Sequence, residues 1–282
     1  MRSYASNNNH LSSRVESLFD TLINRSKIHR KKCGANVKRE LCRDFVSVIM
    51  GVRPAFMLDY APLLCKEDVE LMCKELNEEL FLVRSSRSNG GEGVHLKVCT
   101  VLDTVVLVTI GGGDESFSAS SHDIKEMPIL VNLDEEQAGS RRLEPSELVV
   151  ITACRAKVAS NSRANIDETD LGEGVIPPQT FVGWMLGYPI LYYYGLNKEE
   201  NEEWSARVAA RKLSLCSLVK IECIDDKNEV MYGFTYPESL NEDALIKETL
   251  KSWMDGIQKQ KQQYAIGLSV RVTHCRPSPV AL

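Results

Sequence analysis

Nine cysteines offer the most chemistry in this sequence, and their spacing limits what they can do. Zinc sites usually present Cys or His in closely spaced pairs such as C-x-x-C. The nearest cysteine pairs here are Cys65/Cys73 and Cys216/Cys223, and C-x-x-C does not occur. Cys73 and Cys223 fall on the apolar faces of a predicted helix and a predicted strand, which is typical of thiols that act as small hydrophobes. The sequence therefore predicts no metal site, and we expect no cofactor.

Two polar loops contain residue types that catalyse reactions in other proteins. Residues 111–113 are three glycines after a strand pattern, as in a phosphate-binding loop. No Lys-Ser or Lys-Thr follows them, and the next residues, Asp114 and Glu115, would repel a phosphate. Residues 120–123 include Ser, His and Asp, but a catalytic triad is defined by geometry in space and not by adjacency. We predict no catalytic residue, and the balance of these signals favours a protein that is not an enzyme.

An alternative hypothesis is an enzyme of unknown class. Its site would be assembled by the loops at 87–93, 111–123 and 159–177, because long loops on a rigid scaffold often carry function.

The uncharged stretch FVGWMLGYPILYYYGL, residues 181–196, is the most unusual feature of the chain. Pro178 can begin a helix, Gly187 can end it, and ILYYYG is rich in strand-forming residues, so we expect a helix, a break and a strand. The stretch fits the middle of a folded core, a partly exposed aromatic surface for a protein partner, or the lining of a small-molecule pocket. For the second interpretation, the candidate partner-binding residues are Trp184, Tyr188 and Tyr193, because Trp and Tyr are enriched at binding hot spots.

Successive residues on a strand face opposite sides. At least one of Tyr192, Tyr193 and Tyr194 is therefore expected to differ in exposure from its neighbours.

Charge and hydropathy exclude two classes of partner. The net charge is −5, so the excess of Lys and Arg that a general nucleic-acid binder uses is missing, and no nucleic acid is expected. No apolar run reaches the ~18 to 20 residues that cross a bilayer, so no membrane is expected either. The N-terminus carries no signal-peptide pattern, and the cysteines are interpreted as reduced thiols in a protein of the cytoplasm or the nucleus. The basic stretch 25–39 fits a nuclear import signal or a solvated helix end and linker.

The hydrophobic pattern predicts an α+β fold, with mostly antiparallel sheets and packed amphipathic helices. We expect a disordered tail over residues 1–10 and a single globular domain over 11–282, with the loop at 159–177 as a possible divide between two lobes. Capping boxes at Ser13–Glu16 and at Ser239–Glu242 are expected to begin helices. Helices are predicted over 11–23, 36–51, 66–80, 197–213 and 239–257, and strands over 55–60, 94–101, 105–110, 127–133, 147–159, 214–224, 230–237 and 265–275.

The chain also resembles a known family. The segments PPQTFVGWMLGYPILYYYGL and LVKIECIDDKNEVMYGFTYPESL are similar to those of a vertebrate family of uncharacterised proteins. That family is named for open reading frame seventy-four of human chromosome one. The resemblance covers most of the chain past the N-terminal tail and implies a single intracellular unit, but it implies no activity. The preferred hypothesis is a soluble, intracellular, non-catalytic protein that acts through contacts with an unknown protein partner.

Overall fold

Two sets of residues in the computed structural model each make most of their contacts among themselves. Unit 1 lies within residues 1–119 and 155–166, and unit 2 within residues 120–154 and 167–282. The structure describes residues 17, 21, 35–49, 52–58, 66–85, 95–101, 104–110, 128–133, 138–161, 164–172, 174–194, 213, 215–264 and 267–276.

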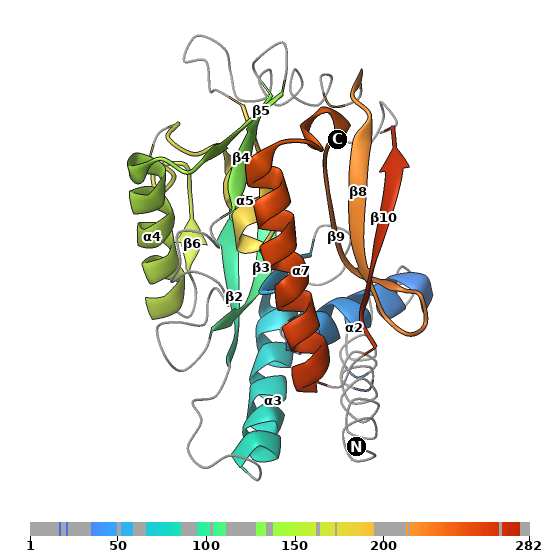
Figure 1. Cartoon of the computed structure of the whole chain (residues 1–282). Helices are drawn as coiled ribbons and strands as arrows, with labels where there is room; N and C mark the ends of the chain where they lie inside the picture. Colours follow the sequence, from blue (N-terminus) through green and yellow to red (C-terminus); the bar gives the residue numbers. More distant parts are fainter. Residues whose placement is uncertain are drawn as a thin grey trace. The chain divides into compact units, whose positions relative to one another are not determined.

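Unit 1 contains two helices and a four-stranded sheet with the strand order β1-β3-β2-β6 (Figure 1). The β1–β3 and β2–β3 pairs are antiparallel, and β6 runs parallel to β2. The position of β3 between β1 and β2 confirms the central strand that its two apolar faces predict. The elements are α2 (Ala35–Ile49), β1 (Ala55–Met57), α3 (Lys66–Ser85), β2 (His95–Val101), β3 (Thr104–Ile110) and β6 (Asn165–Ile166).

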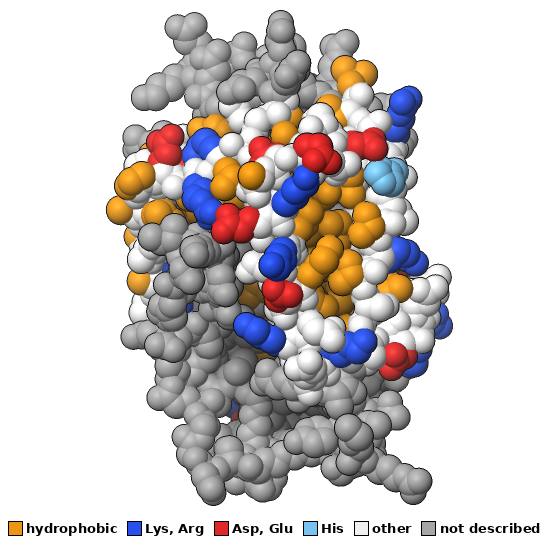
Figure 2. All heavy atoms as spheres, viewed as in Figure 1, with side chains coloured by type: hydrophobic (Ala, Val, Ile, Leu, Met, Phe, Trp, Pro, Cys, Tyr) orange, Lys and Arg blue, Asp and Glu red, His pale blue; other side chains and the backbone are white. Residues whose placement is uncertain are grey.

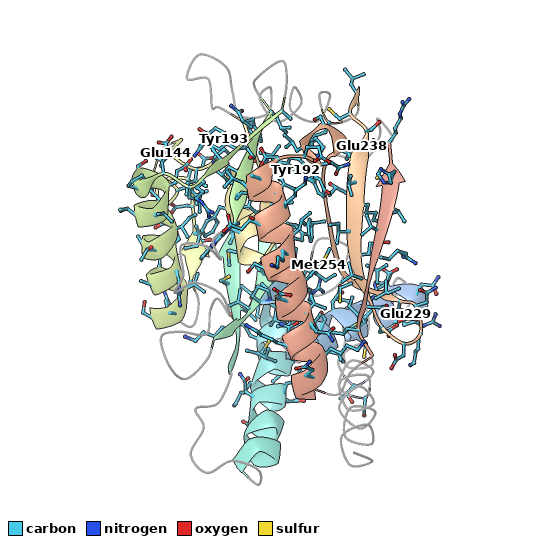
Figure 3. The ribbon with its side chains drawn as sticks, in the orientation of Figure 1. Glu144, Tyr192, Tyr193, Glu229, Glu238 and Met254 are labelled. Atoms are coloured by element: carbon cyan, nitrogen blue, oxygen red, sulfur yellow. The ribbon has the colours of Figure 1, made fainter. Side chains whose placement is uncertain are left out.

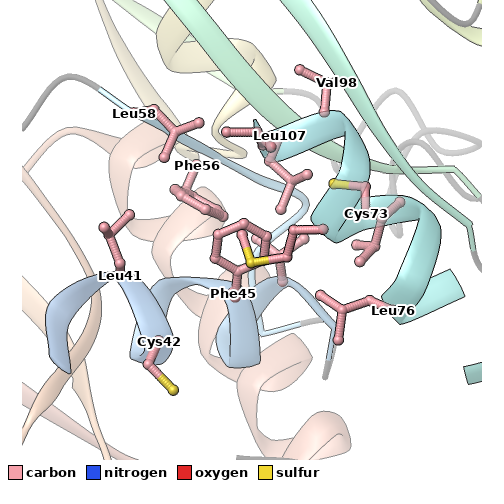
Figure 4. Close-up of a cluster of buried hydrophobic side chains, with 13 residues drawn as sticks. Leu41, Cys42, Phe45, Phe56, Leu58, Cys73, Leu76, Val98 and Leu107 are labelled. Atoms are coloured by element: carbon pink, nitrogen blue, oxygen red, sulfur yellow. The ribbon is translucent and has the colours of Figure 1, made fainter. Parts of the chain in front are cut away.

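The core of unit 1 is built from helix residues at 3.6-residue spacing that pack on strand residues (Figure 4). Phe45 of α2 meets Phe56 of β1 edge to face, with ring centroids 4.9 Å apart. Val69, Met72 and Leu76 of α3 are fully buried, which confirms the predicted apolar stripe. Burial of each such side chain contributes roughly 1.5–3 kcal/mol.

Asn77 of α3 forms hydrogen bonds with the backbone near the start of β2. Its side-chain nitrogen donates to the carbonyl oxygen of Leu96 over 2.9 Å, and its side-chain oxygen accepts from the Leu96 amide over 2.8 Å. The side-chain amide of Asn77 thus forms with Leu96 the two hydrogen bonds that a neighbouring strand would otherwise form. Because buried backbone groups left without partners are costly, this pair fixes where α3 sits on β2.

Unit 2 contains two three-stranded sheets, ordered β5-β4-β7 and β10-β8-β9. The β4–β7 pair is parallel, and the other pairs are antiparallel. Helix α7 packs on β4 and β5 of the first sheet and on β9 of the second. The elements are β4 (Ile129–Asn132), β5 (Gly139–Arg142), α4 (Pro145–Ser160, of which 155–160 belong to unit 1), α5 (Pro178–Met185), β7 (Ile190–Tyr193), β8 (Leu218–Ile224), β9 (Val230–Pro237), the 3-10 helix η2 (Glu238–Leu240), α7 (Ala244–Tyr264) and β10 (Ser269–Cys275).

The strand predicted over 147–159 is wrong, because this segment lies in α4. Its β-branched run, Val149 to Thr152, favours a strand locally. The start signals act against that preference: Pro145 lies at the first helical position, and the side chain of Glu147 accepts from the amide of Glu144 over 2.7 Å. The buried residues Glu147, Ile151, Cys154 and Val158 lie on one stripe at helical spacing.

The second predicted capping box is also wrong in its position. Ser239 lies in the 3-10 turn that follows β9, and α7 begins five residues later at Ala244. Asp243 caps this helix: its carboxylate accepts from the amides of Leu245 and Ile246 over 2.8 and 3.1 Å.

The expected helix, break and strand at the uncharged stretch are confirmed. α5 begins at Pro178, Gly187 follows it with φ of 78°, and β7 begins at Ile190. A positive φ favours glycine because it has no Cβ, so Gly187 ends the helix and turns the chain towards β7.

The protein is α+β, with mostly antiparallel sheets and packed amphipathic helices, as the sequence predicts. Among the described residues, no helix is long and apolar enough to cross a bilayer. The tail at 1–10, the first predicted capping box and the loops at 87–93 and 111–123 lie outside the described residues, as do most of the predicted helices at 11–23 and 197–213 and part of the basic stretch 25–39. The predicted division into a tail and a single domain stays a prediction.

We expect Asn77→Ala to lower the free energy of unfolding by about 1–3 kcal/mol, because it leaves the amide and carbonyl of Leu96 without their partner. Urea unfolding followed by far-ultraviolet circular dichroism measures this change. Glu78→Ala, one residue away on an exposed position, is the matched control and should stay within about 0.5 kcal/mol of the wild type. Equal stabilities for the two variants would show that the Asn77 contacts do not hold α3 on β2.

Candidate functional site

The uncharged stretch lies chiefly in the interior of unit 2. Phe181, Met185, Ile190 and Leu191 are buried. The hydroxyl of Thr180 donates to the carbonyl oxygen of Tyr192 over 2.6 Å and so ties α5 to β7. The core interpretation is therefore confirmed for seven of the fourteen described residues, 181–194, and the other seven are half-buried.

One of the three tyrosines at 192–194 differs in exposure from the others, as expected, but the difference does not follow the alternation of a strand. Tyr194 is buried, whereas Tyr192 and Tyr193 are half-buried. The hydroxyls of Tyr192 and Thr235 share a hydrogen bond of 3.0 Å, which joins β7 to β9. Figure 3 shows Tyr192 and Tyr193 near the upper end of α7.

Each of the three candidate partner-binding residues is half-buried and has a contact within unit 2. Trp184 stacks on Phe181 with ring centroids 5.7 Å apart. Tyr188 lies 5.5 Å from the ring of Tyr232 on β9. The guanidinium carbon of Arg141 on β5 lies 4.6 Å from the ring centroid of Tyr193. The three side chains thus contribute to the fold through separate contacts, and their role in partner binding stays a prediction.

Arg141 also forms a two-pronged ion pair that sequence reasoning missed. Its two terminal nitrogens donate to the carboxylate of Glu147 over 2.8 and 2.7 Å. Burial acts to raise the pKa of Glu147, but the hydrogen bonds from Arg141 and from the Glu144 amide outweigh it, so the pKa lies below its usual range. This carboxylate is a structural anchor between β5 and α4, since its acceptor sites are already used. The Glu-Pro-Ser-Glu pattern at 144–147 is the signal that would have indicated it.

A second buried carboxylate lies in the sheet β10-β8-β9. Glu222 of β8 is 4% exposed. It accepts from Lys220 over 2.5 Å and from two nitrogens of Arg271 on β10 over 2.9 and 2.7 Å. Lys220 and Arg271 together hold the pKa of Glu222 below its usual range. The carboxylate is thus kept charged and fully paired, which suits cross-strand stabilisation better than proton transfer.

Two buried thiols, those of Cys99 and Cys223, do not have the properties of nucleophiles. Burial raises the pKa of Cys99 to about 12 and that of Cys223 to about 11, so both are protonated at neutral pH. Among the described residues, no three His, Cys, Asp or Glu side chains come together in a way that holds a metal ion. His274 pairs with Glu238 over 3.0 Å and faces solvent.

An apolar face of unit 2 is the arrangement best suited to binding. Cross-strand pairing places Val272 of β10 opposite Ile221 of β8, and Ile221 opposite Phe234 of β9. The ring of Phe234 packs edge to face on Trp253 of α7, with centroids 5.1 Å apart. These four residues form a row that we call the apolar row. Figure 2 shows hydrophobic side chains gathered on this face, beside α7.

Two residues at this face correct the sequence analysis. The hydrophobic pattern places Met254 on the apolar face of its helix and Val272 on the apolar face of its strand, yet Met254 is 38% exposed and Val272 is 51% exposed. α7 covers the β9 side of the sheet through Trp253, so the apolar side chain on the outer strand faces water. Hydrophobic periodicity indicates which residues share the apolar faces of α7 and β10. It does not show how much of each face the neighbouring elements cover.

The comparison with known families places the chain in one of them. A family model described as a domain of unknown function, DUF4504, matches residues 22–282. The chain belongs to the DUF4504 family. The matched residues of this DUF4504 chain include α2 and β10 and every described element between them. No curated protein and no solved structure shows significant similarity to it.

We expect acid to remove part of the stability of this DUF4504 chain through Glu222. Because the folded pKa of Glu222 is lowered, its contribution is present above the unfolded pKa of about 4.5 and is lost as the pH falls through the folded value. Glu222→Gln should therefore be less stable than the wild type at pH 7, by about 1–2 kcal/mol. The difference should shrink as the pH falls from about 4.5 through the lowered folded pKa of Glu222.

Urea unfolding at a series of pH values measures this difference. Glu248→Gln is the control, because it removes a more exposed ion pair to Arg142 and should change stability by under about 1 kcal/mol. A Glu222→Gln deficit that stays constant down to pH 3 would contradict the assignment.

Proposed function

We propose that this protein is a non-catalytic intracellular protein that acts through contacts with another protein. The observation that carries the proposal is the apolar face, on which Val272 and Met254 are exposed beside the ring cluster of Trp253 and Phe234. Exposed apolar side chains that continue a buried cluster are typical of surfaces that bind proteins.

The polar clusters support the same conclusion. Three carboxylates are buried among the described residues. Asp44 of unit 1 pairs with Arg53, although burial raises its pKa. Glu147 and Glu222 of unit 2 are each paired with cations of the same unit. A general acid or base needs a proton-transfer partner and a pKa near the working pH, and a lowered pKa is far from that range. Both groups are suited to holding strands and a helix in place.

The enzyme alternative has no specific support among the described residues. Its loops at 87–93 and 111–123 lie outside them. The described part of the loop at 159–177 folds inward, since Ile166, Leu171 and Ile176 are buried.

Trp184, Tyr188 and Tyr193 belong to the same proposal as further contact residues, because each is only half-buried. Residence in the cytoplasm or the nucleus belongs to the same proposal and is supported by the buried, protonated thiols. We also infer that the DUF4504 family includes the family named for open reading frame seventy-four of human chromosome one.

Val272→Asp combined with Met254→Asp is expected to remove the binding partners of the protein, because a charge at each position opposes burial of the apolar face. Affinity capture of the tagged full chain from cells, with quantitative mass spectrometry, measures partner abundance. We expect specific partners to fall about tenfold or more.

Val149→Asp is the matched control, because Val149 is an apolar residue of α4 with 69% exposure. The control variant should keep its partners. An unchanged partner set for a folded Val272→Asp/Met254→Asp variant would overturn the apolar face as the contact surface.

A further inference from the structure

Strand β10 has an open edge among the described residues. It is the outer strand of the sheet β10-β8-β9 and pairs with β8 on its other side. The pairing is regular over all seven residues, Ser269 to Cys275, whereas the β8–β9 pair contains an irregularity at Cys223/Ile224. Ser269, Val272, Thr273 and His274 are exposed.

Proteins usually protect such an edge with lysines, a proline or a bulge. Within β10 there is no lysine and no proline, and its register with β8 is continuous. Its one arginine, Arg271, is turned across its own sheet, because the guanidinium donates to Glu222 of β8. Within β10, the arginine is therefore not directed outward where it would repel another strand, and the exposed His274 pairs with Glu238.

We propose that β10 pairs antiparallel with β10 of a second copy of this chain, about a twofold axis at Val272. This inference rests on the proposed function and names the partner as a second copy. Val272 is the middle residue of the seven in β10, so this register pairs the whole strand. The result is a continuous six-stranded sheet in which the two outward-facing edges are satisfied by each other.

The charges of β10 fit this register. Arg271 lies opposite the partner's Thr273, and His274 lies opposite the partner's Val270, so no two like charges face each other. A register shifted by one residue towards the N-terminus would place Arg271 opposite the partner's Arg271. The electrostatic cost of that arrangement favours Val272 as the centre.

In the proposed dimer, the twofold axis brings the apolar row of one copy next to the apolar row of the other. A twofold axis perpendicular to the sheet keeps both copies of α7 on one face. Val272 then meets the partner's Val272, and the row from Trp253 through Phe234 and Ile221 runs on into its copy. The exposed side chain of Val272 is thereby removed from water, which supplies a driving force besides the backbone hydrogen bonds.

Sedimentation equilibrium of the full chain over a range of concentrations tests the dimer. We expect a monomer–dimer equilibrium for the wild type, and a dissociation constant raised about tenfold or more by Val272→Lys, which puts two ammonium groups at the axis. Val149→Lys, the same change at an exposed position of α4, should leave the equilibrium unchanged. A wild type that is monomeric throughout, or a dimer that Val272→Lys does not weaken, would overturn the proposal.

Cysteine cross-linking tests the register. In Val272→Cys the two introduced thiols face each other across the axis, with Cα atoms about 4.5–5.5 Å apart, which suits a disulfide. In Val270→Cys, on the same face of the strand, they are offset by about 13 Å. Copper phenanthroline oxidation followed by peptide mass spectrometry should find a 272–272 link and no 270–270 link. The reverse pattern, or neither link in a dimeric sample, would contradict this register.

Failure of the dimer and failure of the proposed function are distinguishable. A monomeric wild type overturns only the second copy as partner. The proposed function is contradicted if cellular partners still bind the protein that carries both aspartate substitutions at the apolar face.

Discussion

The packing of Trp253 against β9 is the interaction on which the arrangement of unit 2 depends. The indole lies 6.0 Å from the ring of Tyr232 and 5.1 Å from the ring of Phe234, so it holds the middle of α7 on the sheet β10-β8-β9. Near its start, α7 is held to β5 by a hydrogen bond from Ser140 to Asp243. Since α7 joins both three-stranded sheets, loss of the aromatic contact would release the second sheet from the first along this helix.

The same packing creates the surface that we assign to binding. α7 lies over β9 and leaves β10 at the outside, where Val272 is exposed. The opposite face of this sheet is held by the ion cluster around Glu222, which turns Arg271 inward and leaves the outer edge of β10 without a repelling charge. Aromatic packing on one face and ion pairing on the other therefore leave an apolar edge strand able to pair.

Much of the fold follows from the sequence, because most of its elements carry a clear period. The stripe of Val69, Met72 and Leu76 and the alternation along β8 and β9 predict their elements correctly. The helix α4 was missed because its β-branched run favours a strand, whereas its start signal lies in only three residues: Glu144, Pro145 and Glu147. The exposure of Met254 and Val272 was missed for another reason: periodicity shows which side chains share a face, whereas tertiary packing decides how much of that face is covered.

Hydrogen exchange in the full chain, compared between the wild type and Trp253→Ala, tests most directly whether the indole holds α7 on the second sheet. If it does, the amides of α7 and of β9 lose protection together in the variant, because both depend on the same contact. Trp184→Ala, which removes a ring stacked on Phe181, serves as a matched loss of an indole elsewhere in unit 2. Protection in α7 and β9 that is unchanged by Trp253→Ala, or lost equally in Trp184→Ala, would contradict the account.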